Sequence, residues 1–293
     1  LKLQAKQTED ESERNVLAAR RTAIKWMLVS CFGYLGYKNA RFGRVEAHEA
    51  VTAYGRETLL KAKEIAELDG YEVLHALTDS LWLKKEGLNE GDLKLLCARI
   101  TMATKIEMSL EGLYRWIKFL PSQANAAHPV PNRYFGLFTH GEMKVRGLAC
   151  RRSDTPQFIK EVQQGMLKAL ANAHSLSDRQ AMQPQLDALL QRAIAQFEAG
   201  HISAHQLAGQ QVLSRDPDEY AVSTRAALAA EQYRSAGIRV HSGERVSYVL
   251  QDTKAKAKAE RVVAATSEVP FSYDVAEYLR LLHAAAAEVS WNG

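Results

Sequence analysis

Positively charged residues gather in two stretches of this 293-residue chain. One stretch holds Arg20, Arg21 and Lys25, and the other holds Lys144, Arg146, Arg151 and Arg152. Clustered cations can neutralise the phosphates of a polyanionic partner, and the formal net charge of +4 permits such a partner without identifying it. A lysine on a helix is also often a solvated surface residue, so the clusters by themselves leave both interpretations open.

A single carboxylate stands between two short apolar runs in the stretch YEVLHALTDSLWLKK. The runs are rich in apolar and aromatic residues, and the interruption Thr78-Asp79-Ser80 predicts a tight turn between two strands. Such a turn exposes the carboxylate of Asp79, which could bind a metal ion. Aspartate is also a common turn former, because its side chain accepts hydrogen bonds from nearby backbone, so the residue type does not decide between these roles.

The first third of the chain predicts helices on either side of this hairpin. Residues 11–29 are rich in Ala, Leu, Arg and Glu and contain neither Gly nor Pro, which predicts a helix with Lys25 near its C-terminal end. Residues 45–68 predict a second helix with one apolar stripe before an Asp-Gly pair. A third helix is expected at about 90–102.

Strands are expected in the middle of the chain. Ile106, Met108 and Leu110 alternate with polar residues, as in a half-buried strand. Further strands are expected in the stretches NRYFGLF and EMKVRGLAC. The first half of the molecule should therefore combine helices with antiparallel strands.

The pattern becomes helical after the turn-forming stretch 153–156. An Asp or Thr N-cap beside Pro predicts the start of a long helix there, and a second long helix is expected at about 178–198. One strand is expected at 246–252, and the alternating Lys-Ala run after it predicts either a solvated surface or a nucleic-acid contact. We therefore place a domain boundary at 152/153 and expect a mainly helical second domain.

The stretch RRTAIKWMLVSCFGYLGY resembles the motif Lys-x-x-x-Asn-Ser-x-Tyr-Gly on the fingers helix of family B DNA polymerases. Lys25, Ser30 and Gly33 stand at the matching positions. The resemblance implies that the Lys25 ammonium points at the triphosphate of the incoming nucleotide, where a cation can neutralise charge on the pyrophosphate leaving group. The nucleotide-binding residues that it implies are Arg21, Lys25, Ser30, Phe32 and Gly33.

The stretch LHALTDSLWL resembles the second metal-binding motif of the same family, Tyr-Gly-Asp-Thr-Asp-Ser. Thr78, Asp79 and Ser80 match. The resemblance implies that Asp79 is a metal ligand in a nucleotidyl transfer that uses two Mg²⁺ ions. It also implies that Asp79 and Lys25 are the catalytic residues of this chain.

Two further stretches resemble parts of the family that hold primer–template DNA. PNRYFGLF resembles the segment Lys-Lys-Arg-Tyr, and VRGLACRRSDTPQFIKEVQ resembles the palm-to-thumb junction Lys-Gly-x-Glu-x-x-Arg-Arg-x-Asp. The DNA-binding residues implied by these matches are Arg133, Tyr134, Lys144, Arg146, Arg151 and Arg152. A basic junction of this kind would hold the duplex by phosphate contacts without reading its sequence.

The resemblance covers nearly the whole chain and implies an α+β fold, in which an antiparallel palm sheet with helices precedes a mainly helical thumb. Residues 1–40 would form the end of the fingers helix and the approach to the palm, 41–152 the C-terminal part of the palm, and 153–293 the thumb. The implied function is that of the C-terminal part of a DNA-directed DNA polymerase, which adds deoxynucleotides from dNTPs to a primer on a DNA template.

Several positions depart from the family pattern. Leu77 replaces the first aspartate of the hairpin motif, and His75 and Ala76 replace its Tyr and Gly. Val29 and Phe32 replace the Asn and Tyr of the fingers motif, which should weaken nucleotide binding because an amide and a hydroxyl are lost. The departures favour either slow or damage-tolerant synthesis in repair, as in a divergent archaeal and bacterial branch, or an inactivated polymerase-like subunit that grips DNA or acts as a scaffold.

The first metal motif of the family, Asp followed by Ser-Leu-Tyr-Pro, does not occur in this chain, which opens on Leu1. We therefore expect a fragment or one half of a split polymerase that is inactive alone. A missing N-terminal half, covalent or separate, would supply another aspartate.

Composition excludes several other classes of protein. No apolar run is long enough to cross a bilayer, and the first residues are too polar for a secretory signal, so we expect a cytoplasmic, nucleoid-associated protein with no membrane partner. Cys31, Cys97 and Cys150 are odd in number and far apart, which disfavours a disulfide framework or a zinc site.

Overall fold

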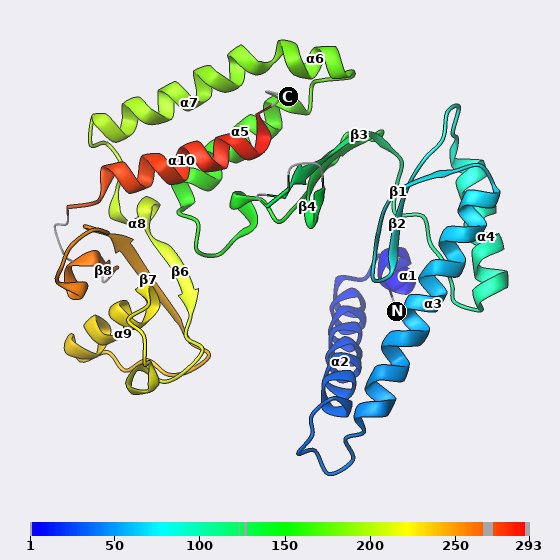
Figure 1. Ribbon diagram of the computed structural model, residues 1–293, viewed down its shortest axis with the longest axis horizontal. Helices are drawn as coiled ribbons and strands as arrows, with labels where there is room; N and C mark the ends of the chain where they lie inside the picture. Colours follow the sequence, from blue (N-terminus) through cyan, green and yellow to red (C-terminus); the bar gives the residue numbers. More distant parts are fainter. Residues whose placement is uncertain (1, 123, 126–127, 266–271, 291–293) are drawn as a thin grey trace. The chain divides into compact units, whose positions relative to one another are not determined.

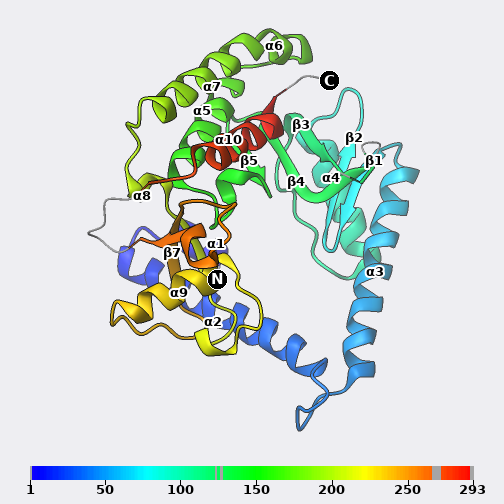
Figure 2. The ribbon, with the colours of Figure 1, turned by 60° about the vertical axis from the view of Figure 1, so that its left-hand side comes forward.

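The computed structural model describes residues 2–122, 124–125, 128–265 and 272–290, shown in Figures 1 and 2. The chain divides into two compact units, residues 1–111 and 112–293. Each unit has its own helices, strands and packing, and each is described by itself.

The first unit combines four helices with one β-hairpin. Its elements are α1 (Lys2–Gln7), α2 (Glu11–Leu35), α3 (Val45–Leu68), β1 (Glu72–Leu77), β2 (Ser80–Lys84) and α4 (Glu90–Thr104). The Asp10 carboxylate caps α2 by accepting the Ser12 N–H at 2.8 Å. Figure 2 shows α2 and α3 diverging from the loop that joins them, so the two long helices share contacts chiefly near that loop.

The hairpin and α4 pack on the C-terminal part of α3. Ala62 and Ala66 of α3 are fully buried, and their small side chains let neighbouring elements approach closely. Leu93, Leu96 and Ile100 form the buried stripe of α4 at helical spacing. This small core fixes the base of the hairpin.

The second unit contains two antiparallel sheets and a set of packed helices. Its elements are β3 (Tyr114–Pro121), β4 (Pro129–Phe138), β5 (Met143–Arg146), η1 (Ala149–Arg151), α5 (Gln157–Leu170), α6 (Leu176–Ala181), α7 (Gln183–Glu198), α8 (Ala204–Leu207), β6 (Gly209–Val212), η2 (Pro217–Glu219), α9 (Arg225–Ser235), β7 (Arg245–Leu250), η3 (Lys258–Arg261), β8 (Val262–Ala264) and α10 (Val275–Val289). The strand orders are β3-β4-β5 and β6-β7-β8.

Helices α5, α7 and α10 pack against one another and join the two sheets (Figure 1). One apolar cluster links Phe135 and Leu137 of β4 with Met166 of α5. Another links Phe197 of α7 with Tyr278 of α10 and with the sheet β6-β7-β8. The first cluster runs across the expected palm–thumb boundary at 152/153, and the assignment of 1–40, 41–152 and 153–293 to fingers, palm and thumb stays a prediction.

The expected α+β class is confirmed, and so are the helix at 45–68 and the hairpin around Thr78-Asp79-Ser80. The predicted strand over Ile106, Met108 and Leu110 is wrong. Lys105 ends α4 in the left-handed conformation, with φ of 60°, and the strand starts only at Tyr114. Alternation of apolar residues was misleading here because Ile106 stays exposed instead of packing on a sheet.

The single helix predicted at 178–198 is also wrong. It is broken at Met182 into α6 and α7, because Pro184 in the first turn of α7 cannot continue a preceding helix. The Lys-Ala run was expected to be a solvated surface or a nucleic-acid contact, and its lysines Lys254, Lys256 and Lys258 are exposed. The strand β8 that follows it was not predicted, and Val262 of this strand is fully buried. The second half of the chain therefore has more sheet than its sequence predicted.

Candidate functional site

Helix α2 presents a basic stripe on its surface. Arg14, Arg21 and Lys25 recur at intervals of seven and four residues, so they share one face of the helix with Phe32. The side chains of α2, all of them in the described part of the chain, include none that is buried. Lys25 forms no ion pair with any described residue, so its ammonium is exposed and available to an anion.

The stripe brings together only some of the predicted nucleotide-binding residues. Arg21, Lys25 and Phe32 lie on it, whereas Ser30 lies about 140° around the helix axis from Lys25. Gly33 also lies outside the stripe, about 80° from Lys25. A ligand bound between Arg21 and Phe32 would meet two cations, Arg21 and Lys25, and one aromatic ring.

Phe32 is held in place by the start of α3. Its ring stacks on the His48 ring at 4.1 Å, and its carbonyl oxygen lies 3.1 Å from His48 Nδ1. A Cβ added to Gly36 would lie 3.0 Å from the same imidazole, so the end of α2 and His48 are closely packed. The C-terminal end of α2 is thereby anchored, while the basic stripe remains open.

Asp79 stands at the tip of the β1–β2 hairpin, with an exposed carboxylate. Leu77 pairs with Ser80, so only Thr78 and Asp79 form the turn. Thr78 has φ of 50°, an unfavourable value for a β-branched residue, and the Asp79 N–H donates to the Leu77 carbonyl at 2.6 Å. Backbone strain of this kind persists where the surrounding structure enforces it, often at functional sites.

Leu77, the residue in place of the expected first aspartate, lies next to this turn and is half-buried. Asp79 therefore provides the carboxylate of the tip, and the Ser80 hydroxyl contacts it at 3.4 Å. Among the described residues there is no group of three or more His, Cys, Asp or Glu side chains that could hold a metal ion. A single carboxylate such as that of Asp79 could supply one ligand at most and does not make a metal site by itself.

The base of the hairpin is anchored by contacts to the end of α3. The Tyr71 N–H donates to the Ala66 carbonyl at 3.0 Å, and the Lys85 ammonium lies 4.6 Å from the centre of the buried Tyr71 ring. Lys85 also donates to the Asp69 carbonyl at 2.8 Å. These contacts fix where the hairpin leaves the unit, and so where Asp79 points.

In the second unit, Lys144 and Arg146 share one face of β5. They pair with Gly136 and Tyr134 of β4, whereas Val145 pairs with Phe135 on the face that packs on the helices. Because side chains alternate along a strand, the two cations point away from that core. Arg146 is exposed and Lys144 is partly exposed.

Arg151 and Arg152 are also exposed, on and just after the η1 turn. The chain enters this turn through Gly147, which has φ of 65° and whose added Cβ would lie 2.3 Å from the Asn132 carbonyl oxygen. Arg152 lies 3.4 Å from the Asp154 carboxylate. Two of the predicted phosphate contacts are therefore carried by one tight turn.

Arg133 and Tyr134 are less accessible than the other predicted DNA contacts. The Tyr134 side chain is 3% exposed and packs near the Phe119 ring, at 5.5 Å between centroids. The Arg133 guanidinium donates to the Glu288 carboxylate of α10 at 2.6 Å. In this structure both residues make contacts within the unit.

Glu288 and Gln163 were missed in the sequence. Glu288 also accepts the Ala149 N–H and the Gln163 side-chain amide, both at 2.8 Å. Gln163 is buried and accepts the Cys150 N–H at 2.7 Å. The only signal in the sequence was that Gln163 and Glu288 are polar residues on the apolar faces of their helices. That signal does not reveal which residues they contact.

Among the helices of the described residues, none is long and apolar enough to cross a membrane.

Comparison with known proteins gives consistent matches. The sequence profile of DNA polymerase family B matches residues 1–91 and 131–289. The DNA polymerase 2 of Saccharolobus solfataricus is 36% identical over 159 residues, which is 54% of this chain and 24% of that protein. The DNA polymerase of Archaeoglobus fulgidus is 26% identical over 251 residues, which is 85% of this chain and 30% of that protein.

The structure of the family B DNA polymerase from Pyrobaculum calidifontis is similar to the whole of this chain, with a TM-score of 0.58 and 25% identity. The match covers 36% of that polymerase. The chain thus spans about a third or less of the length of these relatives.

Proposed function

The chain belongs to DNA polymerase family B, and from this membership we propose that it forms the fingers-helix, palm-hairpin and thumb portion of a DNA-directed DNA polymerase. The complete enzyme would add deoxynucleotides from dNTPs to a primer paired with a DNA template. The observation that carries the proposal is the family match over residues 1–91 and 131–289, because it includes both α2 and the hairpin.

Lys25 is proposed to contact the triphosphate of the incoming dNTP. Lys25 is exposed and lies one helical turn from Arg21, so these two cations of the basic stripe can contact one polyphosphate. A cation that is in place before the reaction stabilises charge on the leaving pyrophosphate without reorganisation. Phe32, on the same face, would lie near the base or sugar.

Asp79 is proposed as one ligand of the Mg²⁺ ions used by the complete enzyme. Its carboxylate is exposed on a two-residue turn that the end of α3 holds in place. The described residues provide no group of three metal-binding side chains, so the other carboxylates are proposed to come from an upstream part of the polymerase. The polypeptide that contributes them is the proposed partner, corresponding to an N-terminal half.

Four exposed or partly exposed cations of the second unit are proposed to hold primer–template duplex. Lys144 and Arg146 point from the outer face of β5, and Arg151 and Arg152 flank the tight turn at η1. Charges in such an arrangement bind phosphates without reading base sequence.

A second candidate is a polymerase-like subunit that has lost catalysis and grips DNA or acts as a scaffold. Leu77 favours it, because this side chain is half-buried where the family motif has an aspartate. Slow or damage-tolerant synthesis in repair is the intermediate case, in which Asp79 still works with a weakened nucleotide site. The inactive subunit and the slow repair polymerase differ in whether Asp79 is needed for activity.

Primer extension by the chain reconstituted with an upstream polymerase half tests these alternatives. Asp79→Asn and Lys25→Ala should each lower Mg²⁺-dependent extension by about 10²-fold or more, since both remove transition-state charge stabilisation. Lys61→Ala on α3 and Glu86→Gln beyond β2 are matched controls at exposed positions and should leave extension unchanged. Duplex binding with no extension in the unsubstituted protein would instead support the inactive subunit.

The repair role needs a separate measurement. The quantity to compare is the rate of extension past a template lesion divided by the rate on undamaged template. This ratio should be at least as high as in a family relative that has the complete hairpin motif. A much larger loss at the lesion would exclude damage-tolerant synthesis.

A further inference from the structure

A cavity of about 50 Å³ lies inside the second unit, where the start of α5 meets β6 and β7. Its lining includes Arg152, Thr155, Pro156, Gly209, Arg225 and Tyr248. One water needs about 10–15 Å³ of such space, so the cavity can hold a few waters or one small oxyanion. The side chains of Arg152 and Asp154 at this cavity are each 52% exposed, so its mouth reaches the surface.

The Thr155 hydroxyl has no hydrogen-bond partner within the described part of the chain. Thr155 is only 5% exposed and lines the cavity. Buried hydroxyls are nearly always hydrogen-bonded, because burying one unpaired loses its bonds to water. This side chain therefore offers an unused hydrogen-bond donor to a polar ligand in the cavity.

The cavity also lies at the N-terminal end of α5. This 14-residue helix begins after Pro156, and no described side chain caps it. The first N–H groups of a helix have no partners within the helix, and the helix dipole adds partial positive charge at this end. An anion in the cavity would satisfy both the helix end and the Thr155 hydroxyl.

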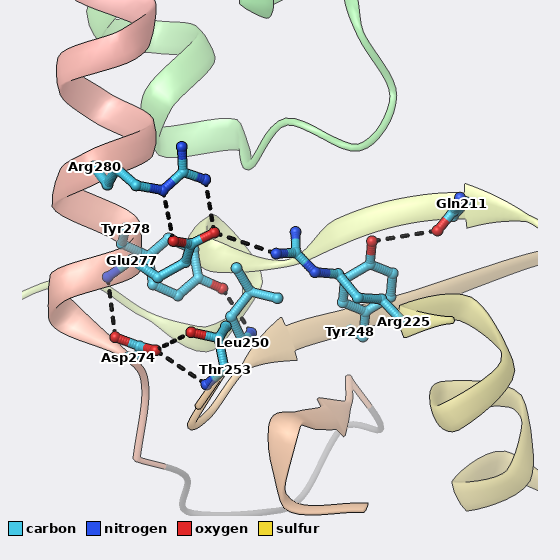
Figure 3. Close-up of polar contacts among 9 residues, drawn as sticks. All are labelled: Gln211, Arg225, Tyr248, Leu250, Thr253, Asp274, Glu277, Tyr278 and Arg280. Carbon is cyan, nitrogen blue, oxygen red and sulfur yellow. Dashed lines mark hydrogen bonds and ion pairs between the residues drawn. The ribbon is translucent and has the colours of Figure 1, made fainter. Parts of the chain in front are cut away.

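Two guanidinium groups face the same space. Arg225 lies 3.2 Å from the Glu277 carboxylate, which is also held by Arg280 at 2.7 Å (Figure 3). Because Arg280 already neutralises Glu277, the remaining N–H groups of Arg225 can serve a ligand. The carboxylate of Asp154 also lines the cavity and would oppose an anion, but Arg152 lies next to it.

We propose that this cavity binds one phosphate group. The Thr155 hydroxyl and the first N–H groups of α5 donate hydrogen bonds to its oxygens. Arg225 contributes positive charge, and Arg152 offsets the nearby Asp154 carboxylate. The phosphate is either a phosphodiester of bound DNA or free inorganic phosphate. The DNA source rests on the proposed polymerase function, whereas the free-phosphate source does not.

Thermal unfolding of the full chain in inorganic phosphate tests the cavity directly. Phosphate, compared with chloride at equal ionic strength, should raise the Tm of the unsubstituted protein and of Thr155→Ser, which keeps the hydroxyl. Thr155→Val should lose the phosphate-dependent rise. Without phosphate its Tm should be no lower than that of the unsubstituted protein, since the lost hydroxyl had no partner. Thr139→Val makes the same change at an exposed position and should respond to phosphate normally.

Duplex binding by the same variants identifies the source of the phosphate. A fall of about tenfold in DNA affinity for Thr155→Val, but not for Thr139→Val, assigns the cavity to a DNA phosphodiester. Unchanged DNA affinity with loss of the phosphate-dependent Tm rise assigns it to free phosphate. If Thr155→Val changes neither quantity, the proposal is overturned. Failure of the unsubstituted chain to bind duplex would count against the polymerase proposal, and the phosphate titration would still decide the cavity.

Discussion

The guanidinium of Arg133 donates a 2.6 Å hydrogen bond to the carboxylate of Glu288, which lies 155 residues further along the chain. The pair joins β4 to the last turn of α10 and is mostly buried, with side chains 28% and 12% exposed. Glu288 also holds the Ala149 N–H at 2.8 Å, so the same carboxylate fixes the start of η1.

Replacement of this carboxylate should be costly. Glu288→Ala removes the carboxylate that accepts hydrogen bonds from Arg133, Ala149 and Gln163, and only Gln163 keeps another acceptor, the Ala285 carbonyl. The substitution is expected to lower the free energy of unfolding by about 2–4 kcal/mol. Urea unfolding measures the change. Glu231→Ala, at an exposed position on α9, is the control and should alter stability by less than about 0.5 kcal/mol. A loss for Glu288→Ala no larger than the control would show that the network contributes nothing to stability.

The exposed cations and the buried aromatic residue of the predicted DNA surface should behave differently. Arg146→Gln and Arg151→Gln should each weaken duplex binding and reduce the slope of log affinity against log salt by about 0.9. Tyr134→Phe should leave affinity within about twofold, because this ring is buried against Phe119. Fluorescence anisotropy at several salt concentrations measures both quantities.

Arg192→Gln on α7 is the matched control for these arginine substitutions, because Arg192 is exposed and outside the predicted DNA surface. Equal losses of duplex affinity for Arg192→Gln and Arg146→Gln would mean that the protein binds DNA by net charge alone.

The same glycine substitution should have opposite effects at two positions. Gly147→Ala introduces a Cβ 2.3 Å from the Asn132 carbonyl oxygen at φ of 65°, and should destabilise the protein by about 2 kcal/mol or more. Gly165→Ala lies within α5 with no heavy atom within 4 Å of the added Cβ, and should stabilise it by about 0.5–1 kcal/mol. Thermal unfolding measures the change in Tm for each variant. Changes of the same sign would contradict the structural account of Gly147.

Stability should fall in acid because two carboxyl groups, at the N-cap and in the first turn of α10, are held in their charged form. Hydrogen bonds from Arg280 lower the pKa of Glu277 below its ordinary value of 4.5. Burial alone would raise the pKa of Asp274, but hydrogen bonds from Thr253 and from the Glu277 N–H lower it below 3.8. A lowered folded-state pKa contributes stability that is present above the ordinary value and lost as pH falls through the folded value.

The urea midpoint should therefore decline as pH falls from 5 to about 2. Glu277→Gln removes one of the two titrating groups, so its midpoint should depend less on pH over that range. An unchanged pH dependence in this variant would indicate that other carboxyl groups dominate acid unfolding.

The sequence by itself determined the elements whose signals are local. The helix at 45–68 has an apolar stripe of helical period, and the hairpin has two apolar runs around a Thr-Asp-Ser turn, so neighbouring residues alone specify both. The motifs around Lys25 and Asp79 also follow from sequence, since a family is recognised by residues at fixed spacing. Family membership needed no coordinates.

Only the tertiary structure decided which polar residues are buried or paired with other residues of the fold. Arg133 and Tyr134 have the same residue types as exposed DNA contacts, yet one pairs with Glu288 and the other is buried. The unpaired Thr155 hydroxyl at the cavity is equally hidden from the sequence. Burial and pairing depend on residues that are distant along the chain, and local patterns contain no information about which distant residue will be the neighbour.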